Sequence, residues 1–237
     1  MFPLLVTTAI LVFARPVAYD ASRKHLSAHA DSNRRAVHLL NERVGQTVRQ
    51  TGLPVLFSTD LITHSGCFGN QLSAAIQAVF GRGFERVLVV GNDCPALTVA
   101  DLTHAAAELQ GGRVVLGPDN RGGLYLLGLS REQFNADVLR ELPWQTNQLH
   151  RAIRVHFSAY TVLQLRALSD INATADIWAY QADIQSLRAF ISLLLRLIDR
   201  WASSWSQSVE HRATKPNVYR TGPLRAPPLS MSLLRCR

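Results

Sequence analysis

The chain has 237 residues, 47% of them hydrophobic and 18% charged, which is enough for one α/β domain with a sizeable core, with or without an appendage. No apolar run reaches the ~18 residues that a membrane-spanning helix needs, so we expect no transmembrane segment. The formal net charge is +8, but most of it lies near the C-terminal end, so it does not indicate a nucleic-acid-binding core.

The first residues, MFPLLVTTAILVFARP, are consistent with a signal peptide or with a first strand. They lack a basic start and a small-residue cleavage site, and their Val, Ile and Thr content favours the strand. Three cysteines, an odd number without C-x-x-C spacing, indicate neither a disulfide framework nor a zinc site. We therefore expect a cytoplasmic protein.

Apolar runs rich in β-forming residues then alternate with longer helical patterns. The predicted strands are 8–14, 54–58, 86–91, 113–117, 124–129 and 160–165. The predicted helices are about 32–51, 70–82, 98–110, 131–140 and 145–156, and Thr98 with Asp101 forms a capping box at the start of the third. This alternation is typical of βαβ units and predicts an α/β fold with a mainly parallel sheet.

The C-terminal third contains a further helical pattern at about 175–204. Its apolar residues follow i, i+3, i+4, i+7 spacing, which predicts an amphipathic helix that packs against the domain. Arginines beside the apolar face leave a homodimer contact or a membrane-surface helix as alternatives. From Ser206 onward, six basic residues against Glu210 and four prolines predict a disordered, solvated tail. The expected division is a domain over 1–180, a helix over 181–205 and a basic tail over 206–237.

Two polar turns follow predicted strands. Gly91-Asn92-Asp93 ends the strand at 86–91, and Gly117-Pro118-Asp119 ends the strand at 113–117. In an open α/β sheet, ligands bind outside the carboxyl ends of the strands, so both turns are expected at one crevice. A carboxylate such as Asp93 at the end of a buried strand is explained if it holds Mg²⁺ or Mn²⁺. The alternative is a turn carboxylate that accepts hydrogen bonds from main-chain N–H groups.

A second carboxylate group lies in the segment LSDINATADIW. Asp170 and Asn172 are two residues apart, so in an extended chain their side chains point the same way and are able to complete a metal site with Asp93. Asp176 is expected to cap or support the helix that follows.

Candidate phosphate-binding groups lie in two other places. Arg15 follows the first strand, and Arg23-Lys24 lies a little downstream; if the strand ends at the same crevice, these cations are able to meet a diphosphate, although each is more often a solvated surface residue. Gly122-Gly123 precedes a strand, where glycines allow a ligand to approach the backbone or simply form a tight turn. The chain has no P-loop, G-x-G-x-x-G or G-x-S-x-G motif, which argues against a P-loop NTPase, a nicotinamide enzyme and an α/β-hydrolase.

The ordered segments resemble a known family. They are AILVFARP, FGNQLSAAIQAVFGRGFERVLVVGNDCPAL, VVLGPDNRGGLYLLGL, LPWQT and LSDINATADI. Over about residues 8–180 they are similar to bacterial glycosyltransferases of the nucleotide-diphospho-sugar transferase superfamily, which are sometimes assigned to arsenosugar biosynthesis and are distantly similar to molybdenum-cofactor guanylyltransferase.

The resemblance implies a Rossmann-like GT-A fold, a nucleotide or nucleotide-sugar donor, and a divalent metal on Asp93. The family's closing D-x-D-T-x-x-D segment matches Asp170 and Asp176, with Asn172 in place of the middle Asp. Its D-G-G segment reads Arg121-Gly122-Gly123 here, which reverses a charge, and its K-T-R-L segment is SRKHL, so that Lys24 matches only approximately.

These observations predict a metal-dependent glycosyltransferase with a nucleoside-diphosphate-sugar donor and an unidentified acceptor. Mg²⁺ or Mn²⁺ on Asp93, Asp170 and Asn172 is expected to neutralise the departing diphosphate. The expected substrate-binding residues are Arg15, Lys24, Asn92, Arg121, Gly122 and Gly123, with Asp93 catalytic and Asp119 a candidate general base. Two alternatives stay open: a nucleotidyltransferase acting on a nucleoside triphosphate, and a domain that binds a nucleotide or partner without catalysis because Arg121 impairs the site.

Overall fold

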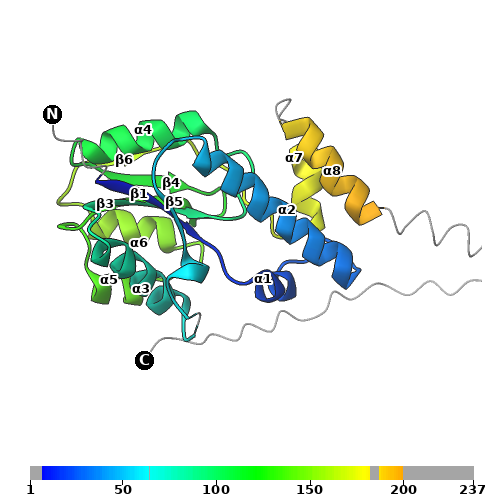
Figure 1. The fold of residues 1–237 in the computed structure, drawn as a ribbon, viewed down its shortest axis with the longest axis horizontal. Helices are drawn as coiled ribbons and strands as arrows, with labels where there is room; N and C mark the ends of the chain where they lie inside the picture. Colours follow the sequence, from blue (N-terminus) through cyan, green and yellow to red (C-terminus); the bar gives the residue numbers. More distant parts are fainter. Residues whose placement is uncertain (1–6, 64, 182–186, 200–237) are drawn as a thin grey trace, which may run out of the picture.

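The computed structural model describes residues 7–63, 65–181 and 187–199 (Figure 1). Its centre is a six-stranded sheet in the order β2-β1-β3-β5-β4-β6, in which only β5 runs antiparallel to its neighbours. The strands are β1 Thr8–Phe13, β2 Val55–Phe57, β3 Arg86–Gly91, β4 Val114–Pro118, β5 Leu124–Ser130 and β6 Val162–Gln164. The predicted α/β fold with a mainly parallel sheet is confirmed, and β5 reverses direction because a short turn joins it to β4.

Helices cover both faces of this sheet (Figure 1). They are α1 Val17–Arg23, α2 Ala30–Arg49, α3 Phe68–Gly81, α4 Val99–Gln110, α5 Ala136–Glu141, α6 Leu149–His156, α7 Thr174–Gln181 and α8 Arg188–Asp199, with a short 3-10 turn, η1, at Ser58–Asp60. One core unites α2, α4, α7 and α8 with one face of the sheet, and the other core unites α3, α5 and α6 with the opposite face. The central strands are therefore buried on both sides, as their continuous apolar runs predict.

Two features of the helices differ from the sequence prediction. Helix α1 was not predicted, and the expected long helix at 175–204 consists, within the described residues, of the separate helices α7 and α8. The predicted capping box at the start of α4 is present, since the Thr98 hydroxyl accepts from the Asp101 main chain and the Asp101 carboxylate accepts from the Thr98 main chain.

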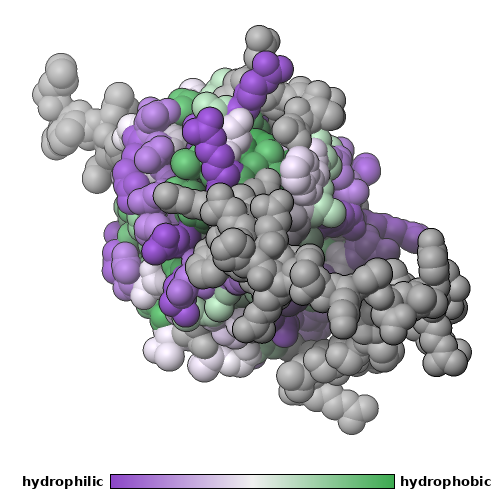
Figure 2. All heavy atoms as spheres, turned by 90° about the vertical axis from the view of Figure 1, so that its right-hand side faces the viewer, coloured by the Kyte–Doolittle hydropathy of each residue, from purple (hydrophilic) through white to green (hydrophobic). Residues whose placement is uncertain are grey.

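Helix α8 packs against α2 and α7. Leu187, Ile191, Leu194 and Leu195 are buried at this contact, whereas Leu193 is 48% exposed. At this end of the molecule, apolar surface is visible between hydrophilic side chains (Figure 2). Packing against the domain, the preferred interpretation of this helix, is therefore observed, and a homodimer stays a prediction. The expected basic tail at 206–237 lies outside the described residues.

Within the described residues, no helix combines the length and the apolar character that crossing a bilayer requires. Cys94 is free and buried. The cytoplasmic location stays a prediction.

Candidate functional site

The candidate site lies where β1 and β3 end together. The register pairs Phe13 with Gly91, so the segments that follow the two strands leave the sheet side by side. A cavity of about 310 Å³ opens there. Five predicted site residues line it: Arg15, Lys24, Asn92, Asp93 and Asn172. The sheet edge therefore brings together groups that lie more than 150 positions apart in the sequence.

A main-chain segment across the strand ends carries the second carboxylate group into the site. Ile171 N–H donates to the Asp93 carbonyl at 2.9 Å, and His25 N–H donates to the Asn172 carbonyl at 2.9 Å. Thr174 N–H in turn donates to the His25 carbonyl at 3.0 Å. These bonds fix residues 171–174 between the end of β3 and the segment after α1, and so place Asn172 beside both Asp93 and Lys24.

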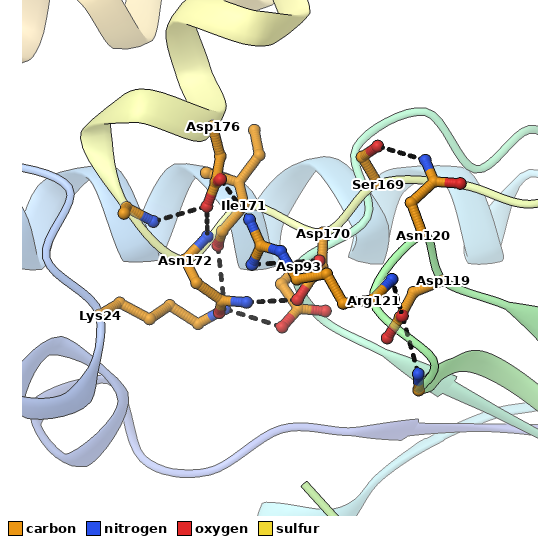
Figure 3. A network of polar contacts seen from close by, with 12 residues as sticks. Lys24, Asp93, Asp119, Asn120, Arg121, Ser169, Asp170, Ile171, Asn172 and Asp176 are labelled. Atoms are coloured by element: carbon orange, nitrogen blue, oxygen red, sulfur yellow. Dashed lines mark hydrogen bonds and ion pairs between the residues drawn. The ribbon is translucent and has the colours of Figure 1, made fainter. Parts of the chain in front are cut away.

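The ammonium group of Lys24 is the centre of the polar network in Figure 3. Its Nζ donates to Asp93 Oδ2 at 2.8 Å, to Asn172 Oδ1 at 2.9 Å and to the Ile171 carbonyl at 3.2 Å. The Lys24 side chain is only 9% exposed. The half-buried carboxylate of Asp93 at the end of β3 is therefore paired with a lysine.

Arg121 forms ion pairs with two other carboxylates of the network. Its guanidinium lies 3.5 Å from Asp170 Oδ1 and donates a hydrogen bond to Asp176 Oδ1. The Asn172 amide donates to Asp170 Oδ2 while its oxygen accepts from Lys24, so Asn172 links the two halves of the network. Burial raises the pKa of the Asp170 carboxyl, Asp93 raises it further, and Arg121 opposes the shift.

Asp176 has the supporting role that the sequence predicts. Its Oδ2 accepts from the main-chain N–H groups of Asn172 and Ala173, each at 2.8 Å, just before α7 begins at Thr174. Carboxylates at this position satisfy the unpaired N–H groups at a helix start.

Asp119 is held by the turn between β4 and β5. Its Oδ1 accepts from Arg121 N–H at 2.7 Å and from Gly123 N–H at 2.8 Å, which is the turn-carboxylate arrangement. Gly122 has a φ of +87°, and a Cβ there would overlap the Asn147 main chain, so this glycine is required by the turn. A role for Asp119 as general base, and for Gly122 and Gly123 beside a ligand, stays a prediction.

Asn92 and Arg15 also line the cavity. The Asn92 amide donates to Asp20 at 2.8 Å and to Asn41 at 2.7 Å, so it ties β3 to α1 and α2. Arg15 places its guanidinium carbon 4.7 Å from the centre of the Tyr19 ring, and its buried Nε has no hydrogen-bond partner. An unpaired buried donor on a cation is suited to an anionic ligand, whereas Asn92 is already committed within the protein.

The expected residues do not all share one cavity. Arg121 and Asp170 line a second cavity of about 360 Å³, together with Asn120 and Arg166. Arg23, which the sequence pairs with Lys24 as a candidate phosphate-binding cation, also lines the first cavity. Four further residues of its lining were not expected, and nothing in the sequence marks them: Phe13, Asp20, Phe68 and Gln145. Gln145 stands out only in three dimensions, by its positive φ of 62°.

The predicted metal ligands surround the Lys24 ammonium group in this structure. Asp93 Oδ2, Asn172 Oδ1 and the Ile171 carbonyl do converge on one point, but the Lys24 ammonium occupies that point. Among the residues that the structure describes, no three or more His, Cys, Asp or Glu side chains are grouped so as to hold a metal ion. In this arrangement the predicted ligands do not fit Mg²⁺ or Mn²⁺.

Comparison with known proteins confirms the resemblance read from the sequence. Residues 61–146 match the family described as "Uncharacterized protein conserved in bacteria (DUF2064)", a segment that contains Asp93, Asp119 and Arg121. A solved structure from Desulfovibrio desulfuricans G20, assigned as a nucleotide-diphospho-sugar transferase, aligns with a TM-score of 0.68 at 19% identity, over 82% of this chain and 98% of that one. The chain has the nucleotide-diphospho-sugar transferase fold.

Two other solved structures are less similar to this chain. A homologue of Mycobacterium tuberculosis Rv0371c, from Mycobacterium sp. strain JC1, aligns with a TM-score of 0.47 at 14% identity, over 82% of this chain and all of that one. A nucleotidyl transferase from Methanothermobacter aligns with a TM-score of 0.39 at 16% identity, over 73% of this chain and 95% of that one. No curated protein matches the chain at a significant level.

Proposed function

We propose that the protein is a glycosyltransferase that uses a nucleoside-diphosphate sugar. The observation that carries this proposal is the cavity at the ends of β1 and β3, because three cationic side chains, Arg15, Arg23 and Lys24, line it. The carboxyl ends of strands are where open α/β sheets bind ligands, and arginine and lysine are the side chains that bind phosphate groups.

The chain's own residues would stabilise the leaving group. When the sugar leaves the donor, negative charge accumulates on the terminal diphosphate oxygen, and fixed cations at that position lower the barrier. Arg15 is suited to this task because it lines the cavity and its guanidinium lies over the Tyr19 and Phe68 rings. None of these steps depends on a divalent ion, whose requirement stays a prediction.

A nucleotidyltransferase is the second candidate. The same cations would bind a nucleoside triphosphate. The similarity to the nucleotide-diphospho-sugar transferase from Desulfovibrio desulfuricans favours the sugar donor, and the products separate the two reactions. Release of a nucleoside diphosphate supports glycosyl transfer, whereas release of pyrophosphate supports nucleotidyl transfer.

The first experiment is a thermal-shift and calorimetry screen with nucleoside diphosphates, nucleoside triphosphates and nucleotide sugars. A ligand present at about 100 times its dissociation constant should stabilise the protein by about 2.7 kcal/mol. In the variant Arg15→Met, the affinity of the best ligand should fall by about tenfold or more, because a hydrogen bond to a charged group contributes about 1.5–3 kcal/mol.

The matched control is Arg34→Met. Arg34 is a 59% exposed residue of α2 that does not line the cavity, and its loss removes the same charge from the protein. We expect an unchanged affinity in this control. Equal losses in both variants, or no response to any nucleotide, would count against the proposed function.

A further inference from the structure

Lys24 fills a position that has the geometry of a cation site. A lysine ammonium has three N–H donors, and all three find oxygen acceptors here, on Asp93, Ile171 and Asn172. One acceptor is a carboxylate, one a main-chain carbonyl and one a side-chain amide, which are the oxygen types that also surround Mg²⁺. The distances of 2.8–3.2 Å are those of hydrogen bonds and are longer than the ~2.0–2.1 Å of magnesium–oxygen bonds.

Lys24 and Arg121 already pair with the two predicted carboxylate ligands of the network. Asp93 pairs with Lys24 at 2.8 Å, and Asp170 lies 3.5 Å from a guanidinium nitrogen of Arg121 (Figure 3). Asn172 has both polar atoms of its side chain engaged, its oxygen with Lys24 and its nitrogen with Asp170. The three predicted metal ligands therefore already have cationic or amide partners from the chain itself.

A divalent ion would have to displace this arrangement. It would lie within a few ångströms of the Lys24 ammonium, where like charges in a partly buried site repel strongly. Moving Lys24 away would break three hydrogen bonds of a side chain that is 9% exposed. Two of the positions at which the sequence departs from the similar family, Arg121 and Asn172, make the site less negative and so weaken its attraction for a metal ion.

We infer that Lys24 takes the place of the divalent metal ion, with Arg121 paired to Asp170 beside it. The site would then bind the nucleoside diphosphate of its donor without Mg²⁺ or Mn²⁺. The part that concerns the nucleotide rests on the proposed function. The part that concerns the metal does not rest on it, because that part concerns only side chains of the chain itself. Each part therefore has its own measurement.

The metal part is tested by titrating the full-length protein with MnCl₂ alone and following free Mn²⁺ by electron paramagnetic resonance. The unaltered protein should bind no Mn²⁺ up to ~1 mM, a range that covers even weak protein sites. Lys24→Met should gain a Mn²⁺ site below that limit, because it leaves Asp93 and Asn172 without their ammonium partner. Saturable Mn²⁺ binding by the unaltered protein that Asp93→Asn abolishes would overturn the inference.

The matched control is Arg23→Met, which removes a positive charge from the neighbouring residue of the same cavity. It should gain no Mn²⁺ site, since Arg23 makes none of the bonds to Asp93 and Asn172; an equal gain in both variants would contradict the assignment to Lys24.

Lys24→Met leaves a half-buried carboxylate unpaired and is at risk of misfolding. Arg121→Asp, at a 50% exposed side chain, is therefore the second variant and should also gain Mn²⁺ binding, because its carboxylate would lie beside Asp170.

The nucleotide part is tested by calorimetry with UDP, GDP, ADP and CDP, first in EDTA and then in MnCl₂. For any of these that binds, the dissociation constant should agree within about twofold between the two conditions, less than 0.5 kcal/mol. An affinity that rises tenfold or more with Mn²⁺ would overturn the inference while leaving the proposed function intact. If none of the four binds in either condition, the proposed function fails, and the Mn²⁺ titration still decides the metal part.

Discussion

At the scale of single residues, Lys24 and Arg15 show how two cations of one cavity are held differently. Lys24 is surrounded by protein oxygens, whereas Arg15 lies over two aromatic rings with its Nε unpaired. The sequence placed both after the first strand, and it placed Asp93 at the end of a buried strand. It could not pair Lys24 with Asp93, because the two are 69 positions apart and their contact depends on the register of β1 and β3 and on the course of the chain after α1.

Asp20 offers a prediction at this scale. Burial raises the pKa of its carboxyl above the ordinary 3.8, and Asp93 raises it further, against the Asn92 hydrogen bond, Lys24 and Arg15. The folded state therefore holds this proton more tightly than the unfolded state does, and the contribution of Asp20 to stability falls as the pH rises through the window above 3.8. Asp20→Asn should remove that loss, since an amide oxygen still accepts from Asn92.

The measurement is urea unfolding of both proteins at several values between pH 3.5 and 7. The stability of Asp20→Asn relative to the unaltered protein should be greatest at pH 7 and should decline as the pH falls towards 3.8. A difference that is constant with pH, or that grows on acidification, would show that the carboxyl is not destabilised by its burial.

At the scale of secondary-structure elements, the strands were predictable and some helices were not. Continuous apolar runs such as the one in β3 located all six strands to within about two residues. Helix α1 was missed because none of its residues is buried, so the sequence carries no apolar periodicity there. The division between α7 and α8 was missed because residues 175–204 contain neither glycine nor proline to mark a break.

A glycine in the turn between β4 and β5 can be compared with a glycine that lies between α4 and β4. Gly122 and Gly112 have almost the same φ, +87° and +85°, but a Cβ on Gly122 would overlap the Asn147 main chain, whereas one on Gly112 would meet nothing within 4 Å. Gly112→Ala should cost about 1–2 kcal/mol of unfolding free energy for the left-handed backbone alone. Gly122→Ala should cost roughly 1–3 kcal/mol more for the overlap. Equal losses of unfolding free energy in chemical denaturation would mean that the turn accommodates the added Cβ without a loss of stability.

At the scale of the whole molecule, α7 and α8 complete the domain rather than form a separate appendage. The sequence predicted that the helical pattern at about 175–204 packs against the domain, and α8 shares one core with α2 and the sheet. The segment that carries Asp170 and Asn172 leads directly into α7, so the site and this helical layer are connected through the chain.

The adjacent leucines of α8 test that connection. Leu194 is fully buried and Leu193 is 48% exposed, so they differ in burial but not in chemistry. Leu194→Ala should lower the unfolding free energy by about 2–5 kcal/mol in a single cooperative transition. Leu193→Ala should change it by less than about 0.5 kcal/mol. A small effect of Leu194→Ala, or a separate early transition, would indicate that α8 is not part of the cooperative domain.

The most direct test of the account is a crystal structure of the protein with a bound nucleoside diphosphate and MnCl₂, with anomalous data collected at the manganese edge. The account predicts the diphosphate against Arg15 and Arg23, the Lys24 ammonium still on Asp93 and Asn172, and no manganese signal between these two side chains. A manganese peak between Asp93 and Asn172 with Lys24 displaced, or a diphosphate bound outside this cavity, would contradict it.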